Sequence, residues 1–140
     1  MADRRAQADA FAAAAQAFVG TPFRLHGRHS DGLDCVGLVL AALARTGRAV
    51  PQVGGYALRN RTVARWDDAF AQAGFVRAAG MPVRGDLLLL TPGPVQHHLA
   101  VALGPQRIVH AHAGLRRVVA GPFDPAQIAQ LFRLSHTDKD

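Results

Sequence analysis

The stretch GLDCVGLVLAALAR, residues 32–45, decides the fold of this chain. From position 35 onward it is apolar on nearly every side, which predicts a buried central helix rather than an amphipathic surface helix. Asp34 precedes this helix and can cap its free amides, and Thr46-Gly47 ends it. The one cysteine of the chain, Cys35, therefore falls in the first turn of the central helix.

Cys35 is the candidate nucleophile. At a helix N-terminus the helix dipole and the unpaired amides favour a thiolate, so we expect the pKa of Cys35 to be lowered. The same amides can bind the oxyanion that forms when a thiolate attacks a carbonyl. Gly37 leaves a small side on the helix, where another element can approach the sulfur. The alternative is an ordinary cysteine that packs in the core, as most free cysteines do.

Four of the seven histidines gather in one segment: His97, His98, His110 and His112. A thiol nucleophile needs an imidazole to take its proton and a second group to orient that imidazole. With a hairpin turn centred on Pro105, His98 lies opposite His112 and diagonal to His110, and both are within reach of a side-chain pair. The spacing leaves both partners open. His-x-His on a strand is also a zinc-ligand spacing, which is the alternative interpretation of His110 and His112.

The remaining sequence indicates an α+β domain. Helices are predicted where apolar residues recur with helical spacing, at residues 3–19, 35–45, 62–73 and 124–132. Strands are predicted between turn residues, at 75–77, 87–90, 97–103, 107–113 and 116–120, with loops at 24–33 and 48–60. This order indicates N-terminal helices packed on one face of a C-terminal antiparallel meander sheet. The length of 140 residues predicts a single domain, residues 1–140.

The composition excludes several classes of protein. Hydrophobic residues make up 49% of the chain and charged residues 19%, which supports a packed core and argues against disorder. The formal net charge is +6, but the arginines are spread without a dense block, so we expect no direct nucleic-acid binding. One cysteine excludes an internal disulfide, and no apolar run is long enough to predict a membrane span. Nothing in the residues predicts a cofactor.

Residues 20–40, GTPFRLHGRHSDGLDCVGLVL, resemble the active-site segment of the NlpC family of papain-like cell-wall peptidases. They are most similar to the form found in tailed phages and gene transfer agents, in which a Gly-Thr-Pro-aromatic segment and a Gly-Arg loop lead to Asp-Cys-x-Gly-Leu. Three further segments match in order, at compatible spacings: Gly85-Asp86-Leu87, His98-Leu99-Ala100-Val101 and Ile108-Val109-His110-Ala111. The resemblance covers residues 12–113 and implies a papain-like NlpC fold.

The resemblance implies a thiol peptidase with a Cys-His-His triad and no metal. Cys35 matches the nucleophile, His98 the general base and His110 the residue that orients the base, so the resemblance selects His110 where the spacing did not. The implied reaction is hydrolysis of an amide in the peptidoglycan stem peptide, typically the γ-D-glutamyl–diaminopimelate bond, through a thioester.

Four residues near Cys35 are candidates for contacts with the substrate: Phe23, Arg28, Asp31 and Asp34. Arg28 and Asp31 lie in the loop before the nucleophile, where they can meet a charged stem peptide, and a solvated loop is the alternative. Phe23 departs from the family, which usually has Tyr at this position. The tyrosine hydroxyl is thought to help line the oxyanion or substrate site, so its absence removes one source of stabilisation.

The phage-like form of the resemblance also implies a setting. We expect a protein made in the cytoplasm, joined to tail or hub proteins of a phage-like particle or gene transfer agent, and acting on the cell wall in the periplasm of the target cell. The start of the chain has no compact apolar segment typical of a secretory signal, which fits this expectation. Two alternatives keep the resemblance: a structural tail-tip module without turnover, and a related thiol amidase or acyltransferase.

Overall fold

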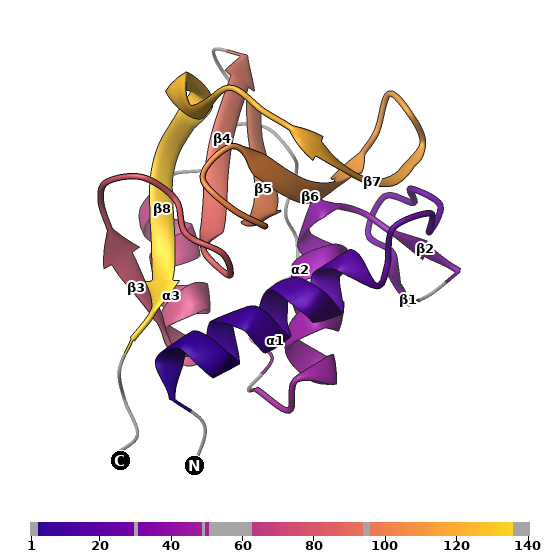
Figure 1. Cartoon of the computed structure of the whole chain (residues 1–140). Coiled ribbons are helices and arrows are strands. Elements are labelled where there is room, and N and C mark those ends of the chain that lie inside the picture. Colours follow the sequence, from indigo (N-terminus) through magenta and orange to yellow (C-terminus); the bar gives the residue numbers. More distant parts are fainter. Residues whose placement is uncertain (1–2, 30, 49, 51–62, 94–95, 136–140) are drawn as a thin grey trace.

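The computed structural model describes residues 3–29, 31–48, 50, 63–93 and 96–135 (Figure 1). Helical segments within these ranges are α1 (Arg4–Gln16), α2 (Cys35–Arg45), α3 (Val63–Gln72) and the 3₁₀ turn η1 (Pro125–Gln127). The strands are β1 (Arg28–His29), β2 (Gly32–Leu33), β3 (Phe75–Ala78), β4 (Leu87–Gly93), β5 (Gln96–Ala102), β6 (Arg107–His112), β7 (Arg117–Pro122) and β8 (Ile128–Leu134).

The three α-helices agree closely with the sequence predictions. α2 has the predicted bounds and α3 lies one residue inside them at each end, whereas α1 ends three residues early because the chain turns toward Gly20, which has a φ of +96°. None of the helices in the described ranges is long and apolar enough to cross a membrane. Most of the loop predicted at 48–60 lies outside the described residues.

The main sheet has six antiparallel strands in the order β3-β8-β4-β5-β6-β7. β4 to β7 form the predicted meander, and the main core lies between the sheet and residues of all three α-helices. In Figure 1, β8 (yellow) runs beside β4, although the two strands are far apart in the sequence. The predicted α+β class is confirmed, with helices packed on the antiparallel sheet.

Strand β4 is buried on both faces of the sheet. Leu87 and Leu89 join the main core on the helix side, and Leu88 and Leu90 join a second apolar cluster on the other side. Phe123, in the connection before β8, packs against this second cluster. The continuous Leu run is therefore explained by apolar neighbours on both sides, where a half-exposed strand would alternate apolar with polar residues.

The helix predicted at 124–132 is wrong. The chain makes only the short turn η1 and then forms β8, which is inserted between β3 and β4. The apolar spacing misled the prediction because Leu131 and Phe132 are neighbours that pack on opposite faces of the sheet. A bulge adds to the irregularity, since Leu89 pairs with Gln130 while Leu90 pairs with Ile128.

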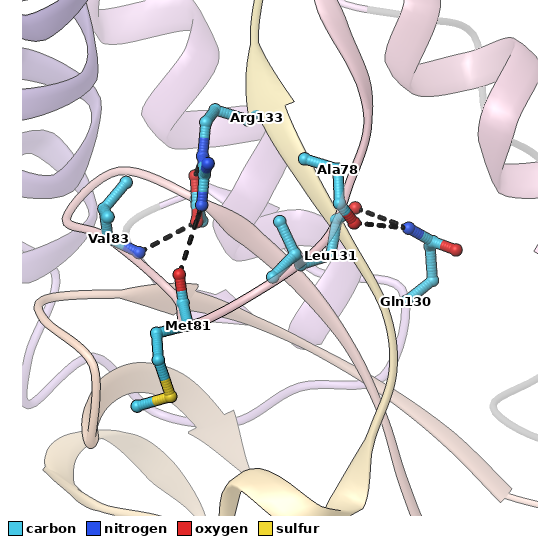
Figure 2. Close-up of polar contacts among 7 residues, drawn as sticks. Ala78, Met81, Val83, Gln130, Leu131 and Arg133 are labelled. Atoms are coloured by element: carbon cyan, nitrogen blue, oxygen red, sulfur yellow. Dashed lines mark hydrogen bonds and ion pairs between the residues drawn. The ribbon is translucent and has the colours of Figure 1, made fainter.

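A buried ion pair fixes the start of β4 to β8. Asp86 is 1% exposed, and its two carboxylate oxygens accept hydrogen bonds from Nε and Nη2 of Arg133 at 2.9 and 2.8 Å. The amide of Val83 donates to the same carboxylate, and Arg133 also donates to the carbonyl of Met81 (Figure 2). Gly85 has a φ of +93°, and a Cβ there would lie 2.5 Å from the carbonyl oxygen of Ala8 in α1. Both carboxylate oxygens of Asp86 therefore have donors, and α1 packs closely against the backbone at Gly85.

Candidate active site

Cys35 opens α2 and lies against strand β5. The backbone amides of Leu99, Val36 and Cys35 itself face its sulfur and favour the thiolate. Because Leu99 directly follows His98, the helix end that carries the thiol lies against the strand that carries the candidate base. The sequence alone did not place these two elements together, since more than sixty residues separate them.

The thiol of Cys35 is protonated at neutral pH. Cys35 is only 2% exposed, and this burial raises the pKa of its thiol to about 12, with the negative charge of Asp34 acting in the same direction. Hydrogen bonds from the backbone amides oppose the rise but do not overcome it. The expectation of a lowered pKa is therefore wrong for this structure, because the cost of burying a charge exceeds the benefit of the helix end. Ionisation of Cys35 needs a base.

His98 and His110 form a direct pair. Nε2 of His98 lies 2.7 Å from Nδ1 of His110, and the two rings meet edge to face with centroids 4.9 Å apart. The pairs Val101–Val109 and Ala102–Ile108 centre the turn on Pro105, as predicted. Of the two partners that the spacing left open for His98, the hydrogen bond goes to the diagonal one.

Both rings of this pair are neutral at pH 7. Burial and the nearby His110 and His112 together lower the pKa of His98 to about 3. Burial and the neighbouring His112 lower the pKa of His110 to about 4. In a neutral pair one ring donates its N–H and the other accepts it. Nδ1 of His98 makes no hydrogen bond to another residue in the described part of the chain.

Asp34 holds the loop before the nucleophile onto α2. It is completely buried, and its carboxylate accepts hydrogen bonds at 2.7 Å from the amides of Gly37 and His26. Nη1 of Arg28 approaches the same carboxylate at 3.4 Å. Asp34 and Arg28, both predicted to contact substrate, are thus engaged with each other and with the backbone.

Gly37 lets this loop approach the helix closely. A Cβ at Gly37 would overlap the carbonyl oxygen of Gly27, and a Cβ at Gly27 would overlap the carbonyl oxygen of Gly32. The element that approaches the small side of α2 is therefore the loop backbone. Asp31, the third candidate of this loop, forms an exposed ion pair with Arg24 at 3.5 Å.

A cleft of about 510 Å³ opens beside the histidine pair. His98, His110 and His112 line it, and Phe23 is the one of the four predicted substrate residues that does so. The amide of Phe23 donates to the carbonyl of Arg116, which ties the segment before the nucleophile to the turn before β7. Cys35 itself is buried and is not among the residues that line the cleft.

Sequence reasoning missed one wall of the cleft. Phe123 lines it from the connection after β7, and Asp124 and Gln127 line it from the segment that was predicted to be a helix at 124–132. The signal for a turn was present in Gly121-Pro122 and Pro125, two prolines that flank this wall. Within the described ranges, no group of three or more His, Cys, Asp or Glu side chains has the arrangement of a metal site.

The fold and this arrangement define the class. A thiol at the N-terminus of a central helix, set against a histidine-bearing antiparallel sheet, is the architecture of papain-like proteins, and solved structures of that class match the chain along most of its length. The model of the NlpC/P60 family matches residues 20–131. The chain belongs to the NlpC/P60 family.

Several solved structures are similar to the chain. The NlpC/p60 domain of peptidoglycan hydrolase SagA is 28% identical, with a TM-score of 0.60 over 91% of this chain and 97% of that one. The P60 domain of an antigen from M. avium subspecies paratuberculosis is 20% identical, with a TM-score of 0.63 over 95% and 97%.

A third similar structure comes from a longer protein. An NlpC/P60 family protein from Bacillus cereus is 21% identical, with a TM-score of 0.65, over 92% of this chain but only 40% of that one. No curated protein matches the sequence.

Proposed function

We propose that this chain is a cysteine peptidase that hydrolyses an amide bond of the peptidoglycan stem peptide. Its family and the peptidoglycan hydrolase among its similar structures support this substrate. The observation that carries the proposal is that Cys35 faces the backbone of Leu99 in β5, directly after His98, whose ring lies within hydrogen-bond distance of His110. In this proposal Cys35 is the nucleophile, His98 the general base and His110 the residue that orients the base.

The hydrogen bond of the histidine pair supports this division of roles. With Nε2–H of His98 donating to Nδ1 of His110, the lone pair of His98 lies on Nδ1, which is the nitrogen left for the thiol proton. When Nδ1 takes that proton, the imidazolium keeps its hydrogen bond to His110, so the charge that forms is stabilised. His110 acts through His98 and touches no reacting atom.

The proposed reaction has two steps. As the proton of Cys35 moves to His98, the sulfur attacks the carbonyl carbon and the carbonyl oxygen becomes an oxyanion, for which amides at the start of α2 are available donors. The C–N bond then breaks, the amine leaves with the proton from His98, and a thioester remains. Water, deprotonated by His98, attacks the thioester and releases the acid and the thiol.

The pKa values of the pair support a neutral resting state. Because the pKa of the thiol is near 12 and that of the imidazole is near 3, the proton stays on the sulfur before substrate binds. Charge separation therefore has to accompany attack on the carbonyl, and it depends on the donors that meet the oxyanion. This requirement makes the missing hydroxyl at Phe23 relevant to the rate.

A second candidate function is a structural module of the same fold with little or no turnover. Two observations favour it: Cys35 is nearly inaccessible, and Phe23 stands in the cleft where the family usually has Tyr. The two proposals differ in turnover. A peptidase releases fragments from purified sacculi and loses this activity in Cys35→Ala, whereas a structural module releases none with either protein.

We also propose the γ-D-glutamyl–diaminopimelate amide as the bond and the tail of a phage-like particle or gene transfer agent as the setting. The similarity of residues 20–40 to the phage form of the family supports both. In that setting the partners are tail or hub proteins, and the wall is cut in the periplasm of the target cell.

Mass spectrometry of fragments released from purified sacculi tests the proposal. New amino termini at diaminopimelate are expected with the parent protein and not with Cys35→Ala. New termini at L-alanine would indicate an amidase that cuts at the sugar–peptide junction instead.

A further inference from the structure

His112 lines the same cleft as His98 and His110, yet the proposed reaction uses neither of its nitrogens. Its Nδ1 accepts a hydrogen bond from the amide of Leu115 at 3.1 Å. An amide donor requires a lone pair on Nδ1, so the ring is neutral in this arrangement and carries its proton on Nε2. His112 therefore presents one ring N–H at a known position on the ring.

The ring of His112 is held in place from two sides. It packs against His110 with centroids 5.3 Å apart and planes inclined by 55°. On the other side, a Cβ at Gly114 would lie 3.0 Å from Cε1 and 3.3 Å from Nδ1 of the ring, which is closer than an ordinary side-chain contact. A donor with a fixed orientation loses little side-chain entropy when it binds a ligand.

Nε2 of His112 makes no hydrogen bond to any residue in the described part of the chain. Most of the cleft lining is apolar or small, including Phe23, Ile108 and Phe123. The one carboxylate of the lining, Asp124, accepts a hydrogen bond from the amide of Ala126 at the start of η1. An unused and oriented N–H in such a cleft is suited to an acceptor on the substrate.

We propose that His112 is a specificity-determining residue whose Nε2–H binds a carboxylate of the stem peptide. This inference rests on the proposed peptidase function. The glutamyl and diaminopimelyl residues that flank the proposed amide each carry a carboxylate close to it. A hydrogen bond to a charged acceptor is stronger than one to a neutral amide, so His112 favours substrates whose carboxylate is free over substrates in which it is amidated.

Three synthetic tripeptides of L-alanine, γ-D-glutamate and diaminopimelate test this inference. One has both flanking carboxylates free, one is amidated at glutamate and one is amidated at diaminopimelate. The parent is expected to cleave one of the two amidated peptides with a kcat/KM about tenfold below that of the free peptide, mainly through KM. The amidated peptide whose kcat/KM falls identifies the carboxylate that His112 binds.

Two variants separate the donor from the structural contact. His112→Asn keeps an acceptor near Nδ1 for the Leu115 amide but has no N–H in the place of Nε2, so we expect it to cleave the free and amidated peptides equally well. His112→Gln carries an amide N–H close to the position of Nε2 and is expected to keep the preference.

Each outcome of this experiment has a distinct meaning. Cleavage of all three peptides at equal rates by the parent overturns the role of His112 and leaves the peptidase function intact. A preference that persists in His112→Asn also overturns it. Failure of the parent to cleave any of the peptides overturns the proposed function, and the inference with it.

Discussion

Two partly buried polar pairs lie at opposite ends of the β4–β5 hairpin, and they are built in different ways. At one end, beside the Leu87–Val101 pair, Asp86 and Arg133 cancel each other's charge through two hydrogen bonds. At the other end, where Leu90 pairs with β5, His98 and His110 are neutral, share one hydrogen bond and face a cleft. The carboxylate of Asp86 is fully hydrogen-bonded within the protein and stabilises the fold. The histidine pair leaves ring nitrogens without a protein partner in the described residues, and these can bind a ligand.

The largest effect on activity is expected when the thiol of Cys35 or the imidazole of His98 is removed. Cys35→Ala and His98→Ala are each expected to lower kcat/KM on sacculi or stem peptides by more than about 10³-fold, because attack on the carbonyl needs both groups. The melting temperature of Cys35→Ala should stay within about 5 °C of the parent, since only one sulfur is lost from the core. Cleavage by Cys35→Ala at the parental rate would show that the nucleophile has been misassigned.

At the Asp86–Arg133 end of the hairpin, a substitution is expected to lower stability and to leave activity nearly unchanged. Asp86→Ala leaves the partly exposed guanidinium of Arg133 and the amide of Val83 without their acceptor, so the free energy of unfolding in urea should fall by about 2 kcal/mol. The activity of the molecules that remain folded should be close to that of the parent. Asp9→Ala is the matched control, because it breaks an exposed ion pair with Arg84 and should cost less than about 1 kcal/mol. Equal effects of the two variants would contradict this account.

His110 tests whether the histidine pair needs a second imidazole or only an acceptor. His110→Leu removes the acceptor for Nε2–H of His98, and kcat is expected to fall about 10²-fold because the base loses its orientation. His110→Asn offers an amide oxygen close to the position of Nδ1 and should keep kcat within about tenfold of the parent. A loss of equal size in both variants would mean that His110 must itself exchange a proton.

The same pair should make the protein sensitive to acid. The unfolded chain binds protons on His98 and His110 below pH 6.5, whereas in the folded protein their pKa values are about 3 and 4. The unfolded state therefore binds more protons, and the contribution of these rings to stability is lost as the pH falls from about 6.5 toward 3. The drop in urea midpoint from pH 7 to pH 4.5 should be smaller in the double variant His98→Asn/His110→Asn than in the parent. Replacement of the exposed His29 by Asn should leave the drop unchanged.

The sequence predicted the parts of this molecule that depend on local pattern. The bounds of α2, the cap at Asp34 and the turn centred on Pro105 follow from residues close together in the chain, and all three are confirmed. β8 could not be predicted in this way, because its bulge and its position between two other strands depend on partners far away in the sequence.

The same distinction between local pattern and long-range packing applies to the candidate site. Local sequence identified Cys35 and the histidine cluster, and it gave the helix end that favours a thiolate. It could not give the burial of the sulfur, which depends on how β5 and the loop at 20–33 pack over α2 and which reverses the direction of the pKa shift. It could not choose between His110 and His112 either, because both lie within reach of His98 and ring orientation decides the hydrogen bond.

The smallest effect is expected at Phe23, the cleft residue at which this chain departs from its family. Phe23→Tyr adds a hydroxyl to the wall beside His98 and His110, and kcat should rise up to about tenfold if that hydroxyl reaches the oxyanion. Phe123→Tyr is the matched control, because it adds the same group to another residue of the cleft lining, and we expect no gain. A gain in kcat for Phe23→Tyr alone would indicate that the site lacks a donor at this position. An unchanged kcat would indicate that the amides at the start of α2 already supply the stabilisation. The polar groups of the active site would then all have partners during the reaction, as those of Asp86 have in the resting protein.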